Sequence, residues 1–74
     1  MYKKVEFSDL GNLIYQRRKS RKITQEQLAM ISGLGIRFIR EVEKGKPTSQ
    51  IEKVFLILHY LGLDLYYFEQ DEQK

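Results

Sequence analysis

Helix-ending residues divide this chain into short segments, and that division constrains its fold more than any other feature. Gly33, the run Gly45-Lys46-Pro47 and Gly62 each follow a stretch whose apolar residues have helical spacing. Glycine adopts the left-handed conformation that ends many helices, and proline prevents a helix from resuming. A helix of fewer than about 12 residues is marginal by itself in water, so these segments must pack on one another. The sequence therefore predicts a compact all-α domain of four helices.

The stretch before Gly33 predicts two amphipathic helices. Ser8 is the expected N-cap of the first, which runs to about Arg21. Thr24 begins the second, because a Thr followed three residues later by Gln, here Gln27, is a capping-box pattern. The apolar face of the first helix is expected to contain Leu10, Leu13 and Ile14. The buried side of the second is expected to contain Leu28 and Ile31.

Two further helices are predicted over residues 36–44 and 51–61, and Thr48 or Ser49 is expected to cap the later one. On a helical wheel, three apolar side chains of the third helix fall within about 100° of one another. They are Phe38, Ile39 and Val42. The opposite side of that helix carries Ile36, Arg37, Arg40, Glu41 and Lys44. The apolar positions of the fourth helix cover more than half of its circumference.

The end of the chain has a different pattern. Residues 63–69 form a short aromatic run with partial alternation, which favours a strand over a helix. A strand needs a partner, and either residues 2–7 or the same strand of a second copy would supply one. The sequence therefore divides into a helical unit over residues 1–62 and a C-terminal strand or tail over residues 63–74, which would serve dimerisation or partner contact.

Composition excludes several classes of protein. The 74 residues contain no cysteine and one histidine, so disulfides and thiolate metal sites are ruled out and no metal is expected. No apolar run approaches the roughly 20 residues of a membrane helix, and the first residues lack the apolar core of a signal peptide. The expected location is the cytoplasm. Because no nucleophile–base pair or phosphate-cradling glycine loop is present, we expect neither catalysis nor a cofactor.

The charges are unevenly distributed along the chain. Residues 1–23 hold seven Lys or Arg and two acids, a net charge of +5, and residues 24–49 hold four and three, a net of +1. Residues 50–74 hold two and five, a net of −3. This asymmetry indicates an anionic partner for the first two thirds and another role for the last third. A charged face that only contacts solvent is the alternative interpretation of charge alone.

The second and third predicted helices, joined by a tight turn containing glycine, form a helix-turn-helix. In this arrangement the second helix of the pair lies in the major groove of double-stranded DNA. Arg37 and Arg40 lie on its outward side, and one guanidinium can donate two hydrogen bonds to a guanine. Glu41 can accept from a cytosine amino group or repel phosphate, and Ile36 can touch a thymine methyl group. These four residues are the predicted base contacts.

Phosphate contacts are predicted on both sides of the turn. Thr24 and Gln25 place a hydroxyl, an amide and free backbone N–H groups at a helix N-terminus, where a phosphate is readily held. The loop after the third helix can reach the DNA backbone through Lys44, Lys46 and Thr48. Taken singly, each feature has an ordinary explanation as solvated surface, helix cap or helix stop. Their joint arrangement at this spacing favours DNA binding.

The motifs also resemble a known family. Ile23 to Ala29, then Ser32-Gly33-Leu34, Phe38-Ile39 and Val42 to Pro47 follow the order of the phage-repressor-like helix-turn-helix family, the Cro/C1 or XRE type. The resemblance covers about residues 8–63. Within that family the chain is most similar to the HipB-type antitoxin regulators. Four pieces carry this similarity: Arg17-Arg18-Lys19, Ile23 to Ala29, Arg37 to Pro47 and Leu61 to Leu65.

The resemblance implies roles and partners. Gln25 would lie at a phosphate, and the outward side of the third helix would face the groove. Arg18 and Glu43 would form a half-buried ion pair that ties the first helix to the third. Four helices followed by a short strand imply a homodimer, whose predicted interface contains Leu63, Leu65, Tyr66 and Tyr67. Members of this type often act with a HipA-like Ser/Thr kinase toxin and repress their own operon.

Some positions depart from the family pattern. Lys22 stands where Gly is common, at a left-handed position, which strains the turn by roughly 1 kcal/mol. Arg17 and Arg21 fall on the apolar side of the first helix, where Leu is common. They would reach phosphates or carbonyl groups, or have a structural role. Gly35 replaces a Ser or Thr that often caps the recognition helix, which leaves one phosphate contact open.

The sequence thus predicts a dimeric, sequence-specific repressor of the antitoxin type, with a palindromic operator whose half-sites lie about 10 bp apart or a multiple of that. One alternative is a free-standing regulator of phage or mobile-element type without a toxin partner. Another is a protein-interaction module that has lost DNA binding. His59 is expected to be an ordinary surface or interface residue. The run Tyr66-Tyr67-Phe68 is expected in a dimer or partner interface, with stacking on single-stranded bases as its alternative.

Overall fold

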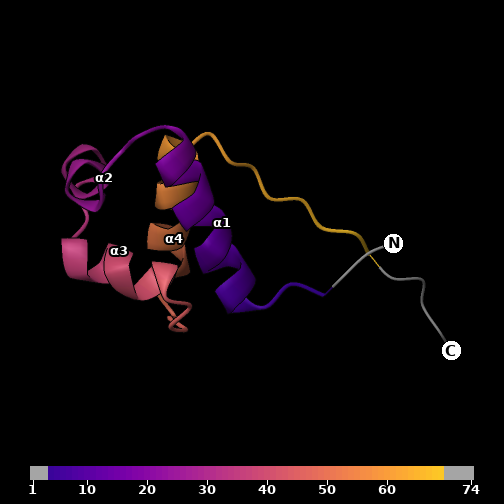
Figure 1. Ribbon diagram of the computed structural model, residues 1–74. Helices are drawn as coiled ribbons and strands as arrows, with labels where there is room; N and C mark the ends of the chain where they lie inside the picture. The colour runs from indigo at the N-terminus through magenta and orange to yellow at the C-terminus, as the bar shows by residue number, and fades with distance from the viewer. Residues whose placement is uncertain (1–3, 70–74) are drawn as a thin grey trace, which may run out of the picture.

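Four helices form in residues 4–69, the part of the chain that the computed structural model describes (Figure 1). They are α1 (Phe7–Ser20), α2 (Gln25–Ser32), α3 (Ile36–Glu43) and α4 (Ile51–Tyr60). No strand is assigned within these described residues. The predicted all-α fold of four helices is confirmed, and the helix ends lie close to their expected positions.

Local hydrogen bonds explain where α1 and α2 begin. The Thr24 hydroxyl accepts from the Gln27 N–H at 3.0 Å, and the Gln27 side-chain oxygen accepts from the Thr24 N–H at 2.8 Å. This confirms the predicted capping box. The prediction that Ser8 caps α1 is wrong. The cap is Glu6, whose N–H donates to the Asp9 carboxylate at 2.8 Å, and this bond starts the helix earlier than expected.

The start of α4 also differs from the prediction. Its N-cap is Gln50, and neither Thr48 nor Ser49 takes that position. The Thr48 hydroxyl accepts instead from the Gln50 N–H at 3.0 Å. A hydroxyl that bonds the backbone two residues further along stabilises a turn in the loop. The Thr48 side chain is therefore used before α4 begins.

Two residues in left-handed conformation shape the turns on either side of α2. Gly33, with φ of 75°, ends α2, and its N–H donates to the Ala29 carbonyl at 2.9 Å. Lys22, with φ of 57°, is the one non-glycine residue with positive φ among residues 4–69. The expectation of a left-handed lysine is confirmed, and its cost is about 1 kcal/mol relative to glycine.

The core forms where α3 packs against α1 and α2, and where α2 packs against α4. Its largest fully buried side chains are Ile14, Leu28, Ile39, Val42, Val54, Ile57 and Leu61. Two residues predicted to be buried are nearly half exposed: Leu13 at 43% and Ile31 at 47%. On α4, Ile51 and Phe55 are also about half exposed. The buried stripe of each helix is narrower than its apolar face, because neighbouring helices cover only part of that face.

Gly11 allows α1 and α3 to approach closely. It is buried, and a methyl group at this position would meet the Val42 carbonyl oxygen well inside contact distance. The same group would lie 3.1 Å from the Glu43 carbonyl oxygen. Any side chain here would push α3 away from α1, so the position requires glycine. No sequence pattern assigned a role to this residue.

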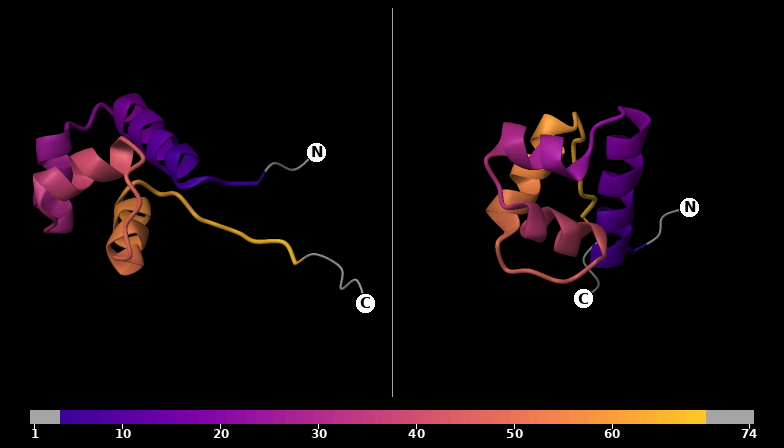
Figure 2. Two further views of the ribbon diagram at one scale, coloured as in Figure 1. Left: turned by 90° about the horizontal axis from the view of Figure 1, so that it is seen from below. Right: turned by 60° about the vertical axis from the view of Figure 1, so that its left-hand side comes forward.

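The chain beyond α4 is extended and leads away from the helices (Figure 2). Leu63 is half-buried against the core, and the next apolar residues are exposed: Leu65, Tyr66, Tyr67 and Phe68. The predicted strand is absent from the described residues 63–69. A strand requires a hydrogen-bonded neighbour, and Phe7, one candidate partner residue, belongs to α1. The candidates Tyr2 and Lys3 lie outside the described residues.

Candidate nucleic-acid interface

The outward face of α3 presents two arginines. Ile39 and Val42 are buried, and the half-buried Phe38 packs on the same core, as the helical wheel predicted. Arg37 and Arg40 are exposed on the opposite side. The neighbouring positions differ in exposure: Ile36 and Glu41 are half-buried, and Lys44 is exposed. The face therefore offers two guanidinium groups to a partner.

Glu41 is shared between two cations. Its carboxylate accepts from Arg37 Nε at 3.3 Å and from Lys46 Nζ at 3.4 Å. Partial burial raises the pKa of the Glu41 carboxyl, but the hydrogen bond and charge of Lys46, followed by those of Arg37, outweigh it and hold the pKa below its ordinary value. The carboxylate is thus ionised at neutral pH. A cytosine amino group would compete with both cations for it.

Arg18 and Glu43 form an ion pair in the interior between α1 and α3. Arg18 Nε and Nη2 donate to the two carboxylate oxygens of Glu43 at 2.6 and 2.9 Å. The two side chains are 8% and 5% exposed, so the pair is more deeply buried than the half-buried pair that the resemblance implied. The hydrogen bond to Glu43 raises the pKa of Arg18. Arg18 Nη1 also donates to the Ile23 carbonyl at 3.0 Å and so holds the loop before α2.

Gln25, the first residue of α2, lies between this pair and Arg40 of α3. Its side-chain nitrogen donates to Glu43 Oε1 at 3.0 Å, and its side-chain oxygen accepts from Arg40 Nε at 3.3 Å. The residue expected at a phosphate is therefore also bonded to two other residues of the predicted site. One hydrogen of its amide group is left for a further acceptor, because the NH₂ group carries two.

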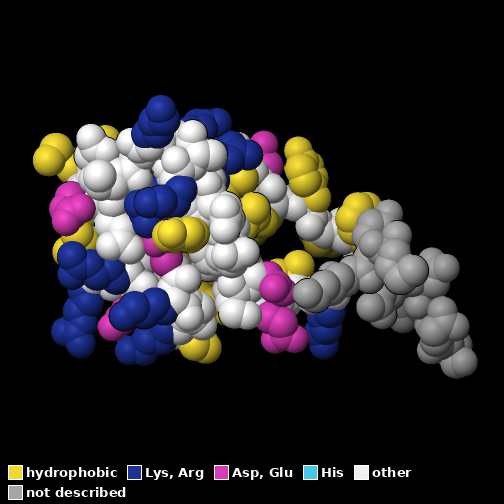
Figure 3. All heavy atoms as spheres, in the orientation of Figure 1, with side chains coloured by type: hydrophobic (Ala, Val, Ile, Leu, Met, Phe, Trp, Pro, Cys, Tyr) yellow, Lys and Arg dark blue, Asp and Glu magenta, His cyan; other side chains and the backbone are white. Residues whose placement is uncertain are grey.

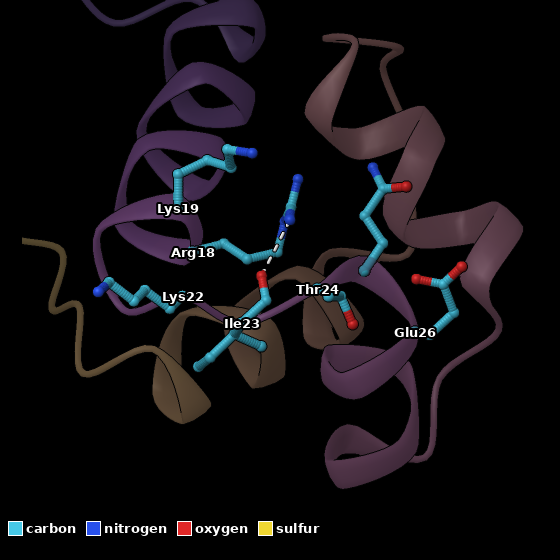
Figure 4. A pocket seen from close by; sticks show the side chains of 7 residues that line it. Arg18, Lys19, Lys22, Ile23, Thr24 and Glu26 are labelled. Carbon is cyan, nitrogen blue, oxygen red and sulfur yellow. Dashed lines mark hydrogen bonds between the residues drawn. The ribbon is translucent and has the colours of Figure 1, made fainter.

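A shallow hollow lies beside the start of α2 and holds basic side chains (Figure 4). It is lined by Arg18, Lys19, Lys22, Ile23, Thr24, Gln25 and Glu26. Lys19 and Lys22 were not predicted as phosphate contacts. The signal for them was present in the run of basic residues just before the capping box. The hollow combines a helix N-terminus with two ammonium groups, which suits a phosphate.

The loop after α3 brings together only part of the predicted set. Lys44 and Lys46 are exposed, so both can reach an anion, although Lys46 already contacts Glu41. Thr48 is half-buried, and its hydroxyl is used in the turn before α4. Gly35 is the N-cap of α3 and supplies no side-chain hydrogen bond there. The two lysines are therefore the better placed groups of this loop.

Arg17 has a structural contact. Its Nη1 donates to the carbonyl oxygens of Leu61 at 3.0 Å and Gly62 at 3.4 Å, at the end of α4. Of the open alternatives for this residue, the carbonyl contact is the one observed. These carbonyls lie just after α4, at its C-cap Leu61 and at the next residue, where the helix supplies no donor.

Basic side chains gather over α3 and near the C-terminal end of α1 on the face that Figure 3 shows.

Within residues 4–69 no group of three or more His, Cys, Asp and Glu residues could hold a metal ion. No helix in that part of the chain is both long and apolar enough to traverse a bilayer. His59 is exposed, with its ring edge-on to Tyr60.

Two comparisons with known proteins identify a helix-turn-helix. A family model described as helix-turn-helix matches residues 14–68. The chain is also similar to an uncharacterized HTH-type transcriptional regulator, y4mF, of Sinorhizobium fredii, with 43% identity over 58 residues. That alignment covers 78% of this chain and 76% of the relative. The match spans α2, α3 and the turn between them.

Proposed function

Because the chain belongs to the helix-turn-helix family, we propose that it is a sequence-specific repressor that inserts α3 into the major groove of double-stranded DNA. Membership of the family makes it a DNA-binding transcriptional regulator, not an enzyme. The choice of repression, the residue contacts and the protein partners belong to the proposal. So does the division into a DNA-binding unit, residues 1–62, and a tail, residues 63–74. A cytoplasmic location stays a prediction.

One observation carries the DNA-reading role: exposed guanidinium groups on α3 lie beside the capped N-terminus of α2. Arg40 of α3 is within hydrogen-bond distance of Gln25 of α2, so a base-reading and a phosphate-binding group lie side by side. We assign base contacts to Ile36, Arg37, Arg40 and Glu41. We assign phosphate contacts to Thr24, Gln25, Lys44, Lys46 and Thr48, and add Lys19 and Lys22 of the hollow. This pairing of exposed arginines with a capped helix N-terminus argues against the alternative of a protein-interaction module that has lost DNA binding.

Alanine at Arg37 or Arg40 is expected to weaken binding to the preferred DNA by about 1–3 kcal/mol, because each removes a guanidinium that bonds a base edge. The loss on DNA of scrambled sequence should be far smaller. Fluorescence anisotropy measures both, with the duplex that the wild-type protein selects from a randomised pool and a scrambled duplex of the same composition. Lys4→Ala, which removes one positive charge ahead of α1, is the control. Equal losses on the two duplexes would count against base reading.

We further propose a homodimer that forms through the tail. Leu63 is half-buried in the single chain. Leu65 is 48% exposed, and Tyr66 and Tyr67 are each at least 80% exposed. A small domain rarely leaves several neighbouring large apolar side chains in water unless they meet a partner. A two-fold dimer would place two α3 helices on one face of the duplex, so its operator would be palindromic.

The double substitution Leu65→Ser with Tyr67→Ser is expected to weaken self-association at least about tenfold, because apolar anchors dominate protein interfaces. Sedimentation equilibrium measures the dissociation constant. The midpoint of thermal unfolding at low protein concentration should stay unchanged, since both side chains are exposed in the single chain. Leu13→Ser, at an exposed apolar residue of α1, is the control. A dimer that survives the double substitution with unchanged affinity would contradict the proposed interface.

We also propose that the protein is the antitoxin of a HipBA-type system, which binds a HipA-like kinase and represses its own operon. The motifs of residues 17–65 that resemble HipB-type regulators support this role. A free-standing regulator is the second candidate. The y4mF relative is named only as a transcriptional regulator, which fits both. A kinase-like product of the neighbouring gene that copurifies with the chain and alters its footprint on the upstream DNA would favour the antitoxin; absence of both would favour the free-standing regulator.

A further inference from the structure

Gln25 of α2 links the buried ion pair to Arg40 on the exposed side of α3, and we propose that it is a positioning residue for Arg40. The resemblance assigns Gln25 a phosphate contact alone. The inference rests on the proposed function, in which Arg40 reads a base. It adds that the orientation of Arg40 is set from outside α3, by a hydrogen-bonded chain that starts in the core.

The chain of contacts runs from a buried group to an exposed one. The Arg18 side chain is 8% exposed and donates to both carboxylate oxygens of Glu43. Glu43 Oε1 accepts a further bond from the Gln25 amide at 3.0 Å. The oxygen of that amide then accepts from Arg40 Nε at 3.3 Å. Because the nitrogen of the Gln25 amide donates to Glu43, its oxygen is left to accept from Arg40, one turn earlier on α3.

Arg40 donates to Gln25 through Nε, a group that is not needed to contact a base. Its bond to Gln25 engages Nε, so the two terminal amino groups stay available. A pair of parallel N–H groups is what guanine O6 and N7 accept in the major groove. The bond to Gln25 therefore fixes the plane of the guanidinium and leaves donors for a base. A long side chain that is positioned before binding also loses less rotamer freedom on binding.

Arg37 provides the internal comparison. Its side chain is 90% exposed, and the carboxylate that it contacts, that of Glu41, lies four residues further along the same helix. That contact is shared with Lys46 and has no connection to the buried ion pair among the bonds described. Of the two arginines, Arg40 is thus the one whose geometry is supported by a second helix. We expect Arg40 to contribute more to sequence discrimination.

The test is a double-mutant cycle between Gln25 and Arg40. Gln25→Met keeps the size of the side chain and removes both of its hydrogen bonds. The measured quantity is the ratio of affinities for the duplex selected by the wild-type protein from a randomised pool and for a scrambled duplex. A lost phosphate contact lowers both affinities alike, so it leaves this ratio unchanged. Gln25→Met is expected to lower the ratio about tenfold, as groups that share a hydrogen bond couple to that order.

In the Arg40→Ala background, Gln25→Met should change the ratio by less than about twofold, because the group that it positions is gone. If Gln25→Met lowered the ratio by the same factor with and without Arg40→Ala, the two residues would act independently, and the inference would be overturned. A wild-type protein that selects no sequence from the pool would instead overturn the proposed function. Gln16→Met, at an exposed residue of α1, is the matched control. If Gln25→Met does not fold, Gln25→Asn, which is one methylene shorter, carries the same expectations.

Discussion

Replacing Glu43 with alanine is expected to destabilise the protein by about 3–5 kcal/mol, because it leaves the Arg18 guanidinium charged and largely buried without its carboxylate. The bond from Arg18 to the Ile23 carbonyl would remain, but a neutral oxygen does not compensate a buried charge. A domain of this length has a total stability of roughly 4–11 kcal/mol. The substitution would therefore remove a large part of it. Urea unfolding followed by circular dichroism measures the loss.

The control for this experiment removes both charges together. Replacing a buried pair by apolar residues of similar size is often neutral or stabilising, so Arg18→Met combined with Glu43→Leu should be far less harmful than Glu43→Ala. This comparison separates the penalty of an unpaired charge from the contribution of the pair. A loss below about 1 kcal/mol for Glu43→Ala, typical of an exposed pair, would mean that water screens Arg18. The ion pair would then not hold α1 to α3.

Gly11→Ala is expected to destabilise the protein by about 1–3 kcal/mol or more, although alanine is the better helix former. Helix propensity alone predicts a gain of up to about 1 kcal/mol, so the two effects have opposite signs. The loss should prevail because the added methyl group meets backbone carbonyls of α3, at Val42 and Glu43. Backbone atoms cannot move aside as the end of a flexible side chain can. The free energy of unfolding in urea decides the sign.

Asn12→Ala is the matched control for this substitution. Asn12 follows Gly11 in α1 and is exposed, so alanine there should leave the stability unchanged or raise it slightly. Stabilisation by both substitutions would show that α1 and α3 are not in close contact at Gly11. Because Arg18 and Glu43 join the same two helices, a shift of α3 should also lengthen the bonds of that pair. Reduced DNA affinity would follow from it.

Features that depend on a few adjacent residues could be predicted from the sequence. The Thr24 and Gln27 capping box and the end of α2 at Gly33 each involve contacts within one or two turns, and both are as expected. The inward side of α3 was also predicted, because its apolar and charged residues separate cleanly around the helix. The position of the turn between α2 and α3 follows from these local signals.

Features that depend on distant neighbours were missed. Leu13 and Ile31 have the right spacing for burial, but whether a neighbouring helix covers them depends on crossing angles that the pattern does not encode. Gly11 gave no signal, because the close approach of α3 exists only in the folded chain. The contacts of Gln25 with Glu43 and Arg40 join two helices, α2 and α3. The prediction of a strand in the tail was wrong for the same reason, because a strand forms only beside another strand to which it can hydrogen-bond.

The contact of Arg17 with the Leu61 and Gly62 carbonyls ties α1 to the point where the tail leaves the helical body. One guanidinium of α1 thereby helps to hold the start of the segment proposed to join two copies. In such a pair, the separation and tilt between the two α3 helices would depend on this contact and on the packing of Leu63 against the core. The Arg17 contact would thereby influence how many base pairs separate the two half-sites that the dimer binds. It would do so although Arg17 is distant in sequence from every residue proposed to contact a base.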